Sequence, residues 1–200
     1  MSKYYEYAEI PLNIFLFYLT FYVFAPILHE LGHIVVLYTF HCPYFSRIDI
    51  VFLRSFFGKT YQNCVLSPIK QFLVYIAGIT TTSLFGLIFA ILDVELTKKG
   101  KLREAITCIF ISIGFFMNTA VYFFEDVGDV KFALEAIGMS AYSHFIKLIG
   151  VSIILFALII MLLNLIHHME IELEIAVAEE EGRKEDEVKT RKQHSRRPKE

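Results

Sequence analysis

Long apolar stretches separated by short polar segments run along most of the chain. Four of them hold no Asp, Glu, Lys, Arg or His, and they cover residues 10–28, 71–92, 105–124 and 148–166. Each is close to the ~20 residues that a helix needs to cross ~30 Å of hydrocarbon. The pattern predicts an all-α integral membrane protein with about four transmembrane helices, embedded in a lipid bilayer as a multi-pass protein of the cell membrane.

The segments between these stretches predict three smaller features. After residues 41–43 the run SRIDIVFLRSFF alternates in part, GKTYQN is typical of a turn, and YQNCVL reads as a second short extended piece. Together they predict a β-hairpin-like loop. Ser67 followed by Pro68 is a helix-start signal. Residues 130–141 predict a short, partly amphipathic interfacial helix before the last stretch.

Composition and charge divide the chain into two parts. Hydrophobic residues make up 56% of it, above the roughly 45–50% expected of a soluble domain. Residues 170–200 carry 10 of its 21 acidic and 8 of its 19 basic side chains. We therefore expect a membrane domain over residues 1–169. The charged tail over 170–200 should be helical through IELEIAVAEEE at most and largely disordered.

Three cysteines form no metal-binding pattern. Cys42 and Cys64 flank the hairpin loop and could pair in an oxidising space, but we expect free thiols. No phosphate-binding loop, Ser/His/Asp arrangement or basic aromatic surface is present, so the sequence predicts no nucleotide or nucleic-acid binding.

The first apolar stretch contains an ionisable triplet, His29, Glu30 and His33, in the run PILHELGHIVV. Residues 10–40 as one helix would be about 46 Å long at ~1.5 Å per residue, so the helix must tilt, kink or break. Pro26 provides a cause one turn before the triplet. Ionisable groups at membrane depth are costly, so they tend to mark a site or to face a cavity.

The spacing of the triplet is that of a zinc hydrolase. Positions i and i+4 share a helix face, so His29 and His33 can direct ring nitrogens at one ion, with Glu30 beside a water bound there. Zinc lowers the pKa of such a water, and the glutamate takes its proton during attack on a carbonyl. A buried polar cluster that only holds helices together is the plainer alternative.

A catalytic zinc usually has a third protein ligand. The run EDVGD offers Glu125, Asp126 and Asp129 just after the third apolar stretch. If the first stretch carries His33 toward one membrane face, the second stretch returns to the opposite face and the third brings this run to the face of His33. A turn in which Asp129 caps the following helix is the alternative.

These features resemble the site-2 protease family of intramembrane zinc metalloproteases. The resemblance covers about residues 20–140 and rests on HELGH, on Ala77-Gly78, and on Asn118 followed by an acidic run. It implies His29 and His33 as zinc ligands, Glu30 as the catalytic carboxylate and Asn118 in the substrate cavity.

The third ligand that the resemblance implies is Asp129, with Asp126 as the alternative. The sequence departs from the family because no proline follows Asn118 and neither aspartate precedes a glycine.

The resemblance implies a zinc metalloendopeptidase that cuts membrane protein substrates within or near a transmembrane helix. Polar residues at Thr80–Ser83, Asn118 and Thr119 would admit water to the site, and an edge of the hairpin would hold the unwound substrate. The alternatives are an inactive, adaptor-like member and another HExxH membrane protease with a glutamate as third ligand. Orientation, substrate and homo-oligomerisation stay open.

Overall fold

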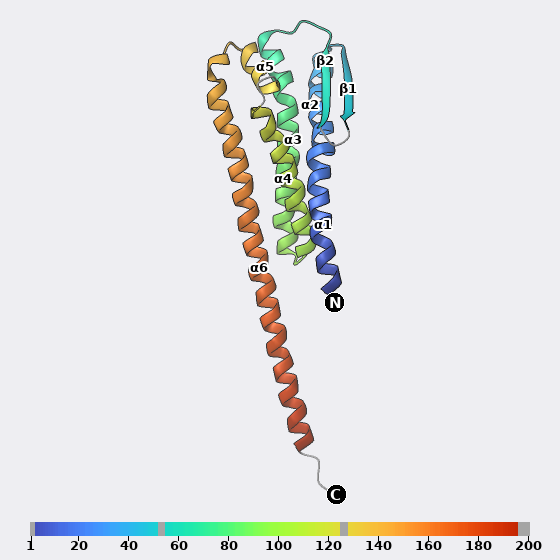
Figure 1. The fold of residues 1–200 in the computed structure, drawn as a ribbon, viewed down its shortest axis with the longest axis vertical. Helices are drawn as coiled ribbons and strands as arrows, with labels where there is room; N and C mark the ends of the chain where they lie inside the picture. The colour runs from blue at the N-terminus through green and yellow to red at the C-terminus, as the bar shows by residue number, and fades with distance from the viewer. Residues whose placement is uncertain (1–2, 52–54, 125–127, 196–200) are drawn as a thin grey trace. The chain divides into compact units, whose positions relative to one another are not determined.

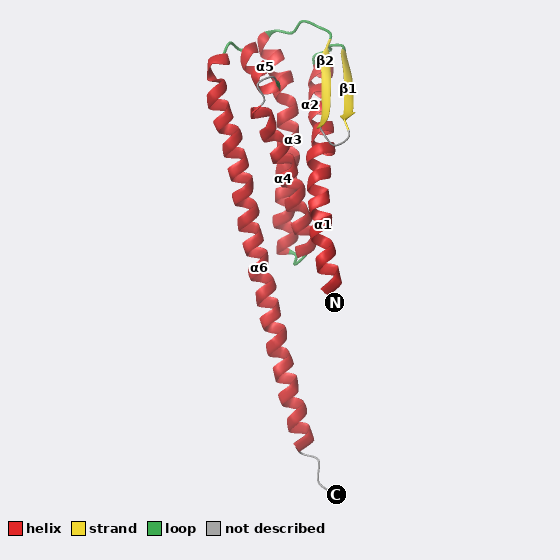
Figure 2. Cartoon of the chain, in the orientation of Figure 1, coloured by secondary structure: helices red, strands yellow, loops and turns green. Residues whose placement is uncertain are grey.

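The computed structural model describes residues 3–51, 55–124 and 128–195. Its helices and strands are α1 (Lys3–Leu19), the π-helix η1 (Thr20–Phe24), α2 (Ala25–Thr39), β1 (Tyr44–Val51), β2 (Ser55–Gln62), α3 (Pro68–Lys98), α4 (Leu102–Phe124), α5 (Asp129–Ala136), the 3-10 helix η2 (Ser140–Tyr142) and α6 (Ser143–Ser195). Figure 1 traces them along the chain, and Figure 2 shows that nearly all described residues are helical apart from one small sheet.

Four helical segments of the described residues are long and apolar enough to cross a membrane. They are Ile10–Thr39, Pro68–Lys98, Leu102–Phe124 and Phe145–Ile171. The prediction of an all-α membrane protein with about four spans and a small hairpin is confirmed. Many large apolar side chains on these helices are exposed, as a lipid-facing surface requires, while small residues such as Ala25, Ala105 and Ala120 are fully buried where helices meet.

The first span is one continuous helical run whose hydrogen-bonding pattern changes before Pro26. The Ala25 N–H donates to the carbonyl of Thr20, a π-type bond. The carbonyl of Phe21 would accept from the N–H of Ala25 in an α-helix, or from that of residue 26 in a π-helix. The N–H of Ala25 is already bound to Thr20, and Pro26 has no N–H. The side-chain amide of Asn118 donates to Phe21 O over 3.2 Å and fills this gap. The irregularity that we predicted at Pro26 is therefore a π-helical turn held from α4.

The hairpin consists of β1 and β2, paired antiparallel from Tyr44↔Gln62 to Val51↔Ser55. The turn predicted at GKTYQN is wrong, because Gly58 pairs with Ile48 inside β2 and the chain reverses between Val51 and Ser55. Pairing along the whole strand overrides the local turn preference of Gly-Lys-Thr.

Cys42 and Cys64 form a disulfide at the base of the hairpin, with Cα atoms 5.6 Å apart. The expectation of free thiols is wrong for this pair. Beside the disulfide, Leu37 and Val74 pack into a small buried cluster that joins α2 to α3. The disulfide and this cluster hold the hairpin against the end of α2.

The chain separates into two compact units, residues 1–161 and 162–200. All functional geometry described below lies in the first unit. In the second, α6 continues as helix to Ser195, whereas the sequence predicted a largely disordered tail. Ion pairs between residues four positions apart support this helix. In one of them, Nζ of Lys184 lies 2.9 Å from Oε1 of Glu180.

Candidate metal centre

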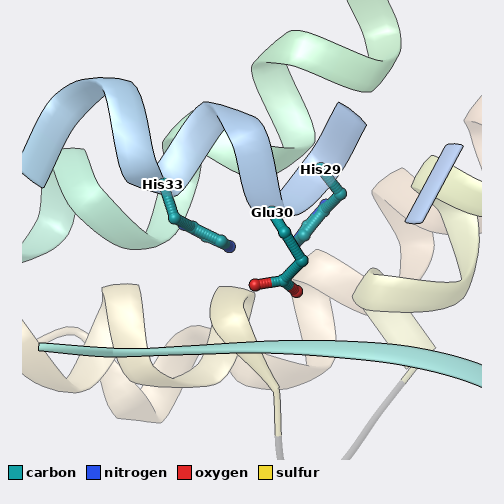
Figure 3. A group of neighbouring side chains, drawn as sticks. All are labelled: His29, Glu30 and His33. Carbon is teal, nitrogen blue, oxygen red and sulfur yellow. The ribbon is translucent and has the colours of Figure 1, made fainter. Parts of the chain in front are cut away.

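His29, Glu30 and His33 lie on one side of α2 and project toward the same space (Figure 3). They are 0%, 5% and 5% exposed. Each offers a ligand atom, and these atoms lie within 4.8 Å of one another. This buried group could hold a metal ion.

Two glycines allow α2 to approach α3 at this depth. A methyl group on Gly32 would lie 2.6 Å from the carbonyl oxygen of Ala77, and one on Gly78 would lie 2.5–2.6 Å from three atoms of the His29 ring. Neither contact is tolerated in proteins. The run Ala77-Gly78 therefore makes room for the His29 ring, which is a more specific role than the general helix packing that such a run indicates.

The His29 ring is held on both faces. Its centroid lies 3.9 Å from that of Tyr122, with an angle of 5° between the planes. A methyl group on Gly78 would lie at nearly the same distance from Nε2, Cδ2 and Cε1 of His29. Gly78 therefore lies over the other flat side of the ring. The imidazole is therefore sandwiched between α3 and α4, and rotation about its side-chain bonds is blocked.

The carboxylate of Asp129 lies against both histidines. Its Oδ2 is 2.6 Å from Nε2 of His29 and 3.1 Å from Nε2 of His33. Asp129 is the first residue of α5, and the N-cap is Gly128, so the carboxylate faces the imidazoles instead of serving as the N-cap that the alternative interpretation required. Two histidines of one helix thus meet an acidic residue about 100 positions later in the chain.

The hydrogen bonds of His33 leave its Nε2 available to a cation. Its Nδ1 lies 2.6 Å from the carbonyl oxygen of Val74, which only accepts, so Nδ1 carries the N–H. A neutral imidazole has one N–H, and Nε2 then presents a lone pair to the carboxylate of Asp129. Either a second proton or a metal cation makes this contact favourable. A backbone carbonyl on the second nitrogen is also the usual support of a ligating histidine.

His29 lacks that support, because its Nδ1 is buried without a hydrogen-bond partner in the described part of the chain. The stacked Tyr122 orients the ring instead.

Burial of Asp129 acts to raise its pKa, but the contacts with His29 and His33 outweigh burial and hold the pKa below its ordinary value. The carboxylate is therefore the anionic form that a cation binds.

Glu30 has a different partner, the hydroxyl of Thr60 on β2. Thr60 Oγ1 donates to Glu30 Oε2 over 2.6 Å, and Ser46 Oγ on β1 lies 3.3 Å from Thr60 Oγ1. Sequence analysis missed Thr60, since this residue falls in the segment that was interpreted as a turn. The hairpin is thus hydrogen-bonded directly to the glutamate of the triplet.

A cavity of about 470 Å³ opens beside Glu30, His33 and Asp129. Its other lining residues come from α2, β2, α3, α4 and the start of α5, and they are Leu37, Lys59, Thr60, Tyr61, Gln62, Val74, Tyr75, Tyr122, Gly128 and Phe132. The lining combines hydroxyl, amide and ammonium groups of β2 with four aromatic rings, one of them also on β2.

The polar residues that we expected to line the cavity lie elsewhere. Thr82 and Thr119 are buried and hydrogen-bond to each other over 2.9 Å between α3 and α4. Asn118 is absent from the cavity wall and instead contacts η1. Thr82 and Thr119 thus satisfy each other across a helix interface, whereas Oδ1 of Asn118 is buried without a hydrogen-bond partner among the described residues.

Asp126, the alternative ligand, and Glu125 lie outside the described residues. Glu135, the glutamate of α5, is about half exposed, and its Oε1 lies 4.0 Å from Nζ of Lys131 on its own helix. Asp129 is the described carboxylate of EDVGD that reaches the histidines.

Comparison with family models, with curated proteins and with solved structures finds no match to this chain.

Proposed function

We propose that this chain is an intramembrane zinc metalloendopeptidase, related in mechanism to the site-2 proteases that its sequence resembles. It would hydrolyse peptide bonds within or near the transmembrane segments of membrane protein substrates. The observation that carries the proposal is the convergence of Asp129 on His29 and His33 beside the carboxylate of Glu30.

The donor set fits a catalytic zinc. Two imidazoles and a carboxylate are a common three-ligand set, which leaves a fourth position open. Bound there, zinc supplies Lewis acidity that makes a water nucleophilic near neutral pH and polarises the substrate carbonyl. A structural site would instead use four protein ligands.

Glu30 is placed to serve as the general base. Thr60 occupies its Oε2, which leaves Oε1 to take a proton from the attacking water and pass it to the leaving amine. The hydrogen bond from Thr60 also fixes the orientation of the carboxylate. The cavity beside Glu30 would supply the water that hydrolysis consumes.

The substitution Glu30→Gln tests this assignment, since the amide keeps the shape of the side chain and cannot take a proton. The purified full chain should retain its zinc, measured by mass spectrometry of metals. It should lose cleavage of single-span reporter helices that carry a tag at each end. The control is Glu104→Gln, in an exposed position at the start of α4.

Two results would refute the proposal. One is unchanged cleavage by Glu30→Gln. The other is a wild-type chain that binds zinc and cuts no reporter in a panel that scans helix length and composition, which would favour the adaptor alternative.

A further inference from the structure

The triplet lies in α2, and the disulfide joins the segment just after α2 to the segment just after β2; Figure 1 shows the hairpin beside α2. His33 is in the last two turns of α2, which ends at Thr39 shortly before Cys42. The strand β2 that leads to Cys64 supplies one wall of the cavity, from Lys59 to Gln62. The disulfide and one wall of the cavity therefore belong to the same hairpin segment.

Disulfides form and persist in oxidising compartments, whereas thiol reductants keep cytosolic cysteines reduced. The pair Cys42–Cys64 joins two positions 22 residues apart in the segment between the first two spans. This segment accordingly belongs on the non-cytoplasmic side of the membrane.

A short cationic turn at the opposite end of α3 agrees with this orientation. The turn between α3 and α4 concentrates four cations within six residues, Lys98, Lys99, Lys101 and Arg103. Short loops rich in Lys and Arg remain in the cytoplasm. The hairpin segment also has four, but they are spread from Arg47 to Lys70. Since α3 is a single span, a cytoplasmic turn puts the hairpin on the other side.

We infer that the metal centre opens to the non-cytoplasmic, oxidising face of the membrane, and that its substrates are membrane proteins whose scissile segment lies at the non-cytoplasmic end of a transmembrane helix. The substrate part of this inference rests on the proposed function, while the orientation does not. The hairpin, locked by the disulfide, then forms the outward wall of the site, and the aromatic rings of the cavity receive a segment entering from that side.

Cysteine labelling in intact cells tests the orientation. In the native chain, a membrane-impermeant maleimide should label Cys42 and Cys64 only after treatment with an impermeant reductant. In a Cys42→Ser, Cys64→Ser background, the exposed positions Lys99→Cys and Lys101→Cys should react only after the membrane is permeabilised. Cys108, which is buried, is replaced by Ser in all variants.

Labelling of Lys99→Cys or Lys101→Cys in intact cells overturns the orientation, as does a Cys42–Cys64 pair that is reduced in protein isolated under thiol-trapping conditions. Failure of the Glu30→Gln experiment would remove the protease and leave the orientation standing, so the two outcomes are distinguishable.

Matched reporters test the substrate class. Two single-span helices carry the same cleavable segment, one at the non-cytoplasmic end and one at the cytoplasmic end. The first should be cut at least 10-fold faster. Equal rates, or faster cleavage of the second, overturn the substrate class.

Discussion

Gly78 is the residue whose replacement most directly tests the geometry of the centre. A methyl group at this position, introduced by Gly78→Ala, would lie 2.5 Å from Nε2 of His29 and 2.6 Å from two further ring atoms. Ordinary contacts between such atoms are about 3.5–4.0 Å. The ring must therefore move by about 1 Å, and the stacked ring of Tyr122, 3.9 Å away on the other face, blocks that movement.

The size of the effect follows from the tolerance of metal sites. Ligand distances hold to about ±0.2 Å, so a displacement of ~1 Å removes His29 as a ligand. Loss of a mere supporting contact costs about 10–100-fold in metal affinity, and loss of a ligand should cost at least as much. Overpacking should also lower the free energy of unfolding by about 1–3 kcal/mol.

Zinc affinity of the purified chain, measured by competition with a chelating dye, is the assay. Gly86→Ala on the same helix is the matched control, because its methyl group would meet only phenylalanine side chains, at 3.2 Å or more. It should keep wild-type affinity with a similar or smaller loss of stability. Wild-type zinc affinity in Gly78→Ala would refute the placement of His29, whatever its stability.

Three further predictions concern other parts of the site. Asp129→Ala should lower zinc affinity at least 10-fold in the same dye assay, whereas Glu135→Ala should not; the reverse result would favour the glutamate-ligand alternative. Thr60→Val should reduce turnover about 10–150-fold at unchanged zinc content, since a hydrogen bond to a charged group is worth about 1.5–3 kcal/mol; Thr60→Ser should restore it, and equal rates for both variants would exclude a positioning role. Cys42→Ser opens a loop of 22 residues and should destabilise the hairpin by about 3 kcal/mol, seen as faster limited proteolysis; a rate unchanged from that of the wild type would count against the disulfide.

Some features of the site could be read from local sequence. The spacing of His29 and His33 places both on one helix face whatever surrounds the helix, and Pro26 requires an irregularity just before them. Asp129 was one of three acidic candidates, and counting membrane crossings placed that group at the correct end of the helices.

Other features depend on contacts that no local pattern encodes. The sequence segment around Thr60 predicted a turn, and pairing with β1 made it a strand that reaches Glu30. Asn118 was expected in the cavity, and the carbonyl of Phe21, left without a donor by Pro26, engages it instead. The cysteines gave no pairing signal until the hairpin brought their Cα atoms to 5.6 Å.

By itself, the sequence determined that this chain has about four helices long and apolar enough to cross a membrane, with an HExxH triplet in the first. Hydrophobic length and helical periodicity are local properties, and they act within a turn or a span. Only the tertiary structure decided which carboxylate meets the histidines, what holds Glu30 and why Gly78 cannot have a side chain. These depend on packing between segments up to 100 residues apart, where side-chain shape and the pairing of buried polar groups decide among arrangements that the sequence pattern allows equally.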